Sequence, residues 1–152
     1  MSTTATRAED DAGLAGKVAI IAGGGAAGEG IGNGRAAAIL LARAGTRVLV
    51  ADRENDRVQV FDQDGKLLQV WPTTLIGPAF FYVHADDIVY IPEHNGGLVS
   101  VLTLEGERLA QWGDPSFRSC HGIWGDSRGD LYVVRPGAWG RPRRVVKYVR
   151  LN

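Results

Sequence analysis

The order of apolar and polar residues divides the chain into two parts with different periodicity. Between residues 18 and 52, a short apolar run, a glycine-rich stretch, an alanine- and leucine-rich segment and a second apolar run follow one another. This order predicts a buried strand over 18–22, a helix that ends near Gly45, and a second strand over 47–52. Beyond residue 56, apolar and polar residues alternate around Asp-Gly and Glu-Gly pairs, which predicts antiparallel hairpins.

The second part of the chain repeats itself. "RVQVFDQDGKLLQVW" (57–71) aligns with "LVSVLTLEGERLAQW" (98–112) at an offset of 41, which superposes Gly65 on Gly106 and Asp52 on Glu93. "DDIVYIP" (86–92) matches "RGDLYVV" (128–134) at an offset of 42, and "RRVVKYV" (143–149) resembles "DRVQVFD" (56–62). A period of about 40–45 residues that contains only strands is typical of a β-propeller blade.

The sequence therefore predicts a mixed α/β and β fold, in which one Rossmann-type βαβ unit is joined to about two and a half β-propeller blades. We expect a disordered N-terminal tail over 1–13, a partial Rossmann-like segment over 14–53 and a partial, unclosed propeller over 48–152. The string "VLVADR" (48–53) fits both parts. The strand over 47–52 can pair in parallel with 18–22 and antiparallel with 58–61, which would join the two parts in one mixed sheet. We expect the blades to stack through aromatic side chains, namely Trp71, Phe80, Phe81, Tyr90, Trp112, Trp124 and Tyr132.

Charge and cysteine content narrow the classes of partner. The 17 basic and 17 acidic side chains cancel, so nothing attracts the chain to nucleic acid or to an anionic membrane. We therefore interpret the basic cluster Arg141, Arg143, Arg144 and Lys147 as a solvated loop and strand edge. Cys120 is the only cysteine, which excludes an internal disulfide and a thiolate zinc cluster. The N-terminal segment lacks the apolar core of a signal peptide, and no apolar run approaches the ~20 residues that span a bilayer. These features predict a cytoplasmic protein.

Residues 14–53 resemble the opening of the short-chain dehydrogenase/reductase family. "LAGKVAIIAGGG" and "GEGIGNGRAAA" carry the resemblance. It implies that Gly23, Gly30 and Gly32 are the phosphate-loop glycines, which let the backbone approach a pyrophosphate. Asp52 lies 20 residues past Gly32, about where a carboxylate bonds the adenosine ribose. NAD is therefore a candidate cofactor, weakly bound, and Asp52 should favour NAD over NADP.

The catalytic residues of that family are absent. Hydride transfer there uses a Tyr with a Lys four residues later, but positions +4 from the four tyrosines hold Asp86, His94, Pro136 and Asn152. We assign no catalytic residue, and we expect no dehydrogenase activity.

Residues 48–152 resemble NHL-repeat propellers, and "HGIWGDSRGDLYVV" with "RVVKYVRLN" resembles proteins similar to peptidyl-α-hydroxyglycine α-amidating lyase. That family holds zinc in its central channel through histidines from different blades, and His121 occupies the matching place. Its equivalent at an offset of 42 is Ala79, which cannot bind a metal, whereas a catalytic zinc takes about three protein ligands. We therefore expect no zinc site on this chain alone. His84 and His94 align with turn or strand-end positions and are expected to be solvated.

Three functions follow as hypotheses. The first is a propeller-type binding or scaffold protein fused to a vestigial nucleotide-binding unit. The second is an NAD-binding remnant of an oxidoreductase. The third is a metal-dependent, lyase-like propeller that is active only if other chains complete the site. For any of them, open blade faces and strand edges favour self-association.

Overall fold

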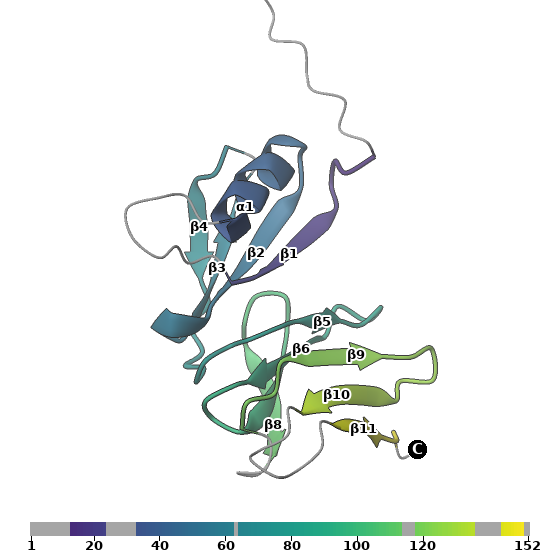
Figure 1. Ribbon diagram of the computed structural model, residues 1–152. Helices are drawn as coiled ribbons and strands as arrows, with labels where there is room; N and C mark the ends of the chain where they lie inside the picture. The colour runs from purple at the N-terminus through teal and green to yellow at the C-terminus, as the bar shows by residue number, and fades with distance from the viewer. Residues whose placement is uncertain (1–12, 24–32, 63, 114–117, 136–143, 151–152) are drawn as a thin grey trace, which may run out of the picture.

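The computed structural model describes residues 13–23, 33–62, 64–113, 118–135 and 144–150, and the strands of these residues form three sheets (Figure 1). Sheet A contains, in spatial order, β1 (Val18–Ala22), β2 (Arg47–Asp52), β3 (Arg57–Phe61) and β4 (Leu67–Val70). Sheet B contains β5 (Tyr82–Val83), β6 (Val89–Glu93), β7 (Leu98–Leu102) and β8 (Arg108–Gly113). Sheet C contains β9 (Gly122–Gly125), β10 (Leu131–Arg135) and β11 (Arg144–Tyr148). The helical segments are α1 (Asn33–Arg43) and the single turn η1 (Arg53–Asn55).

Strand β2 pairs on both of its edges, as the sequence predicts. It runs parallel to β1, with Ile20 opposite Leu49, and antiparallel to β3, with Leu49 opposite Val60. Because α1 lies between β1 and β2 in the chain, the first part is a βαβ unit built directly into sheet A. The two predicted parts therefore share one sheet, and β2 belongs to both.

The predicted repeat is visible in the backbone hydrogen bonds of sheets B and C. The amide of Ala79 donates to the carbonyl of Pro92, and the amide of His121 donates to the carbonyl of Val134, so both bonds occur at the offset of 42. In each sheet the first strand lies at one edge, beside the second. In sheet A that edge is β1, which runs parallel to its neighbour, whereas β5 and β9 run antiparallel to theirs. Sheet A thus keeps the strand order of a blade with one strand reversed.

The sheets stack face to face through two apolar cores. Between sheets A and B, Leu49 and Val60 pack with Trp71, Phe81 and Ile91. Trp71 and Phe81 meet edge to face with ring centroids 6.3 Å apart, an arrangement that aromatic pairs favour. Between sheets B and C, the buried side chains are Val99, Cys120, Ile123 and Val133, with four partly buried aromatic residues around them. The stack is therefore continuous from the first sheet to the third.

Helix α1 covers the face of sheet A that points away from sheet B (Figure 1). Ala42 at the end of α1 is buried against Val48 and Val50 of β2. Helix α1 ends at Arg43, and Gly45, the predicted C-terminal cap, has a φ of +83°. The amide of Gly45 donates to Ala42 and that of Thr46 to Leu41, which is a Schellman motif. In the described residues no helix is long and apolar enough to cross a membrane.

Two of the predicted stacking aromatics are not in the core. Trp71 and Phe81 are buried and Tyr90, Trp112 and Tyr132 are half-buried, but Phe80 is 37% exposed and Trp124 is 65% exposed. For Phe80 the prediction was wrong, since the neighbouring Phe81 lies in the core instead. Trp124 lies outside the core that contains Ile123, but its ring contacts Tyr82 of sheet B at a centroid distance of 5.3 Å, so it still packs between neighbouring sheets. The described part of the basic cluster is exposed as expected, except that Lys147 pairs with Asp130 at 2.7 Å. Arg141 and Arg143 lie outside the described residues.

Candidate functional site

The predicted nucleotide segment is described at its two ends. Gly23 follows β1 with a φ of +88°, and its amide donates to the carbonyl of Ala51 at 3.2 Å. A residue with a side chain is strained at such a φ, so this position suits glycine. Gly30 and Gly32 lie outside the described residues. The structure therefore places Gly23 beside the end of β2, one residue before Asp52.

Asp52 lies at the end of β2 with both carboxylate oxygens already bonded. Arg57 Nε donates to Oδ2 at 2.8 Å, and Asn55 Nδ2 donates to Oδ1 at 2.8 Å. The Asp52 side chain is 14% exposed and that of Arg57 is 44% exposed. Each carboxylate oxygen can accept a second hydrogen bond, so a hydroxyl group could still bind here. The adjacent guanidinium was not foreseen, and it offsets the negative charge that Asp52 would present to a nucleotide.

A cavity of about 410 Å³ lies on the α1 side of sheet A. Its apolar wall is formed by Ala38, Ile39, Val50 and Phe61, and its polar lining by Arg35, Asp52, Asn55 and Gln59. Small-molecule sites commonly combine an apolar wall with a few polar groups, and their volumes start at about 300 Å³. The sequence predicts Asp52 at such a site but not the apolar wall, since that wall exists only where α1 crosses β2 and β3.

His121, the predicted metal-channel residue, contacts His94. The two rings meet edge to face with centroids 4.7 Å apart. Burial, the neighbouring His94 and the positive charge of Arg53 lower the pKa of His121. His94 is half-buried, and its Nδ1 lies 2.9 Å from Asn95 Oδ1. The offset of 41 superposes His94 on Arg53, which places both after equivalent strands but does not predict the contact with His121.

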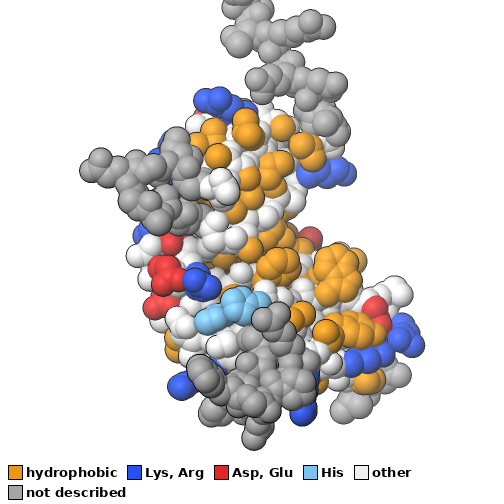
Figure 2. Space-filling model, viewed as in Figure 1, with side chains coloured by type: hydrophobic (Ala, Val, Ile, Leu, Met, Phe, Trp, Pro, Cys, Tyr) orange, Lys and Arg blue, Asp and Glu red, His pale blue; other side chains and the backbone are white. Residues whose placement is uncertain are grey.

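The side chains of Arg53, His94 and His121 follow or precede strands of three neighbouring sheets and lie near one surface. Figure 2 shows histidine side chains beside a group of basic and acidic side chains on the face in view. Within the described ranges, no group of three or more His, Cys, Asp or Glu side chains could hold a metal ion. His84 lies elsewhere: its Nδ1 is 3.2 Å from the amide nitrogen of Asp86 and 3.2 Å from the carboxylate of the same residue. It is half-buried rather than solvated.

Glu93 is a fully buried carboxylate that sequence reasoning did not single out. Its Oε1 accepts hydrogen bonds from Ser100 Oγ at 2.5 Å and from Gln111 Nε2 at 2.9 Å, and its Oε2 accepts one from the amide of Ile76 at 2.7 Å. Arg108 approaches Oε1 at 4.0 Å. Buried charges need such partners. Because every bond comes from within sheet B or the segment that leads into it, this carboxylate holds the blade together.

No family model matches the chain, and no curated protein matches it. Among solved structures, it is similar to virginiamycin B lyase from Staphylococcus aureus, with 14% identity, a TM-score of 0.50, and coverage of 68% of this chain and 38% of that one. It is also similar to a protein of unknown function from Bacteroides caccae, with 13% identity, a TM-score of 0.55, and coverage of 67% of this chain and 41% of that one. A weaker similarity, with a TM-score of 0.45, is to the Dos1 propeller, of which the matched part covers 28%.

At these identities the similarity concerns the fold alone. The chain spans about two fifths of the length of the first two structures. The comparisons, the strand order and the internal repeat agree on a mostly β chain with propeller-type sheets.

Proposed function

We propose that the protein is a binding module without catalysis of its own, in which the stacked sheets act as a scaffold and the outer face of sheet C binds a second copy. The observation that carries this proposal is the exposure of apolar side chains on that face. Trp124 and Val145 are each 65% exposed and Val134 is 42% exposed. Cross-strand pairing of Trp124 with Tyr132 and of Val134 with Val145 puts them on one side of the sheet, opposite the buried Ile123 and Val133.

A second copy is the occupant that the stack favours. Sheets A and B, and sheets B and C, already pack face to face through apolar residues, so a further sheet fits the same kind of surface. Helix α1 covers the far face of sheet A, which obstructs head-to-tail stacking. Two copies would instead meet through their C faces in a closed, two-fold contact. Lys147 on this face is neutralised by Asp130, so like charges do not oppose the contact.

We expect Val145→Glu to weaken self-association at least tenfold. A carboxylate on each copy would be brought into the contact without a partner, which costs roughly 1–3 kcal/mol. Light scattering across a concentration series measures the change. The matched control is Leu40→Glu on α1, where an apolar residue that is 62% exposed lies far from sheet C. A parent protein that stays a monomer at every concentration would contradict the proposal, as would equal weakening by Leu40→Glu.

A second candidate function, nucleotide binding, is favoured by the cavity beside α1. The cavity is bounded by the βαβ unit, and Asp52 lines it, so a ribose hydroxyl would meet a carboxylate there. The apolar wall formed by Ile39 and Phe61 suits a flat base. This candidate function is nucleotide binding without a reaction, so it requires no catalytic residue.

We expect NAD to bind weakly and more tightly than NADP, because the Asp52 carboxylate repels a 2′-phosphate. Arg57 offsets part of this charge through its 2.8 Å contact. Replacing it in Arg57→Gln should therefore widen the preference for NAD by roughly threefold, the effect of one exposed ion pair. Titration calorimetry with both nucleotides tests this. NADP bound as tightly as NAD by the parent would refute the role of Asp52, and binding of neither would refute the candidate.

A further inference from the structure

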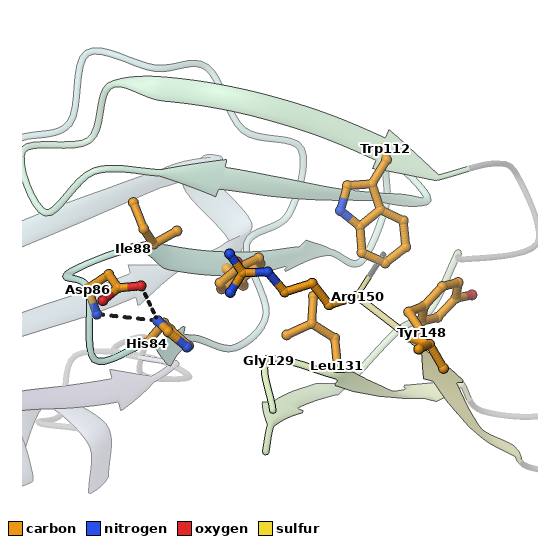
Figure 3. Close-up of a pocket in the computed structure, with 10 residues that line it drawn as sticks. His84, Asp86, Ile88, Trp112, Gly129, Leu131, Tyr148 and Arg150 are labelled. Carbon is orange, nitrogen blue, oxygen red and sulfur yellow. Dashed lines mark hydrogen bonds and ion pairs between the residues drawn. The ribbon is translucent and has the colours of Figure 1, made fainter. Parts of the chain in front are cut away.

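A second cavity, of about 370 Å³, lies between sheets B and C and has no part in the functions above. It is bordered by the turn between β5 and β6, the turn between β9 and β10, and the segment after β11, and side chains of β6, β8, β10 and β11 complete its lining (Figure 3). It does not include Arg53, His94 or His121, so it is separate from the basic group near the other strand ends. Its volume lies within the range of small-molecule sites.

Aromatic side chains line the cavity on the side of the core. Tyr90 comes from β6, Trp112 from β8 and Tyr148 from β11. The rings of Trp112 and Tyr148 lie 4.7 Å apart at an interplanar angle of 54°. All three residues belong to the margin of the core between sheets B and C, so their positions are fixed by packing. Rigid aromatic walls of this kind favour a flat, apolar ligand.

Arg150 extends across the cavity, and its guanidinium points toward His84 and Asp86 (Figure 3). Its backbone is fixed, because the amide of Arg150 donates to Asp130 Oδ1 at 3.0 Å. Gly129 lies against this side chain, where an added Cβ would be 3.0 Å from Arg150 Cδ and 3.2 Å from its Nη1. In the described part of the chain, the guanidinium makes no hydrogen bond and no ion pair. The N–H groups of the guanidinium therefore point into an aromatic cavity and have no hydrogen-bond acceptor among the described residues.

The other charged groups around the cavity decide which anion fits. Asp86 lies at the end opposite the stem of Arg150, with its carboxylate 3.2 Å from His84 Nδ1. Asp130 is already paired with Lys147. One guanidinium and one carboxylate leave the cavity without net charge, which disfavours a dianion such as phosphate and permits a single negative charge beside Arg150.

From these contacts we propose that the cavity between sheets B and C binds a small aromatic carboxylate. The carboxylate accepts hydrogen bonds from the Arg150 guanidinium, which matches its planar geometry. The aromatic ring lies against Trp112 and Tyr148. This binding requires no catalytic step and no metal ion. The site is independent of the contact between copies that is proposed for sheet C.

The test compares indole-3-acetate with indole-3-acetamide, which has nearly the same shape without the charge. Calorimetry should show the acid binding at least tenfold more tightly than the amide. Arg150→Gln should remove that difference and weaken binding of the acid by roughly tenfold or more, as for the loss of a charge-assisted hydrogen bond. Arg43→Gln removes the same charge from the exposed end of α1 and should change nothing. Amide NMR shifts on addition of the acid should be confined to Gly129, Leu131 and their neighbours.

Several outcomes would overturn the proposal. They are equal affinity for the acid and the amide, no binding of the acid at millimolar concentration, shifts that spread to sheet A, and an unchanged affinity in Arg150→Gln. Because Arg150 is exposed, that variant is expected to fold. Thermal melting of the variant verifies this before binding is measured.

Discussion

Replacing Gly106 with alanine is expected to destabilise the protein by about 3 kcal/mol, from backbone strain of roughly 1–2 kcal/mol and overpacking of roughly 1–3 kcal/mol. Gly106 has a φ of +84°, and a Cβ at this position would lie 2.2 Å from Trp71 Cγ. Trp71 is only 3% exposed and packs between sheets A and B, so it cannot move away without disturbing the core.

The internal repeat supplies a matched control for this prediction. Gly65 occupies the equivalent turn: its amide donates to Asp62, as that of Gly106 donates to Thr103. Its φ is +75°, but nothing lies within 4 Å of an added Cβ. Gly65→Ala should therefore cost only the backbone term, about 1 kcal/mol. Urea unfolding of both variants measures the difference. Equal losses would mean that Trp71 does not restrict the turn.

The second large effect is expected at Glu93, where Glu93→Gln should cost about 2–3 kcal/mol. An amide has one acceptor oxygen, whereas Glu93 accepts hydrogen bonds at both of its oxygens. Either Ser100 and Gln111 or the amide of Ile76 would then face an NH₂ group that cannot accept. Because Glu93 is fully buried, no water can replace the lost bond.

Asp52 provides the comparison, since it occupies the same place one repeat earlier. Its carboxylate bonds exposed partners, so Asp52→Asn should cost no more than about 1 kcal/mol. Chemical denaturation of the two variants against the parent measures both losses. A Glu93→Gln loss as small as that of Asp52→Asn would show that the network in sheet B adapts to an amide.

The sequence predicted the parts of the fold that depend on local pattern. The alternating residues and the turn residues repeat at offsets of 41 and 42 residues. The backbone amides of Ala79 and His121, which are equivalent at the offset of 42, donate to equivalent carbonyl groups. The double role of 47–52 followed from its apolar character on both sides: Val48 and Val50 face α1, and Leu49 and Ala51 face sheet B. A strand that is apolar on both faces must be covered on both.

The contacts that the sequence did not predict join residues far apart in the chain. The guanidinium beside Asp52 depends on the turn that η1 makes between β2 and β3. The cavity around Arg150 depends on how sheet C is set against sheet B, which no single segment encodes. Trp124 was predicted to stack between blades, but its strand directs Ile123 into the core, and the largely exposed indole contacts sheet B only at its margin, through Tyr82.

The reversed direction of β1 has a consequence for the order of folding. Strands β2, β3 and β4 are joined by short turns, whereas β1 reaches β2 only through a crossover that contains α1. Contacts across short loops form first, so β1 and α1 should dock last, onto an edge of β2 that is already formed. Amide hydrogen exchange would reveal this as faster exchange in β1 than in β3, and equal rates would exclude it. Until β1 docks, the unpaired backbone groups on that edge of β2 are open to a strand from another chain, so the docking of β1 protects the protein against misassembly.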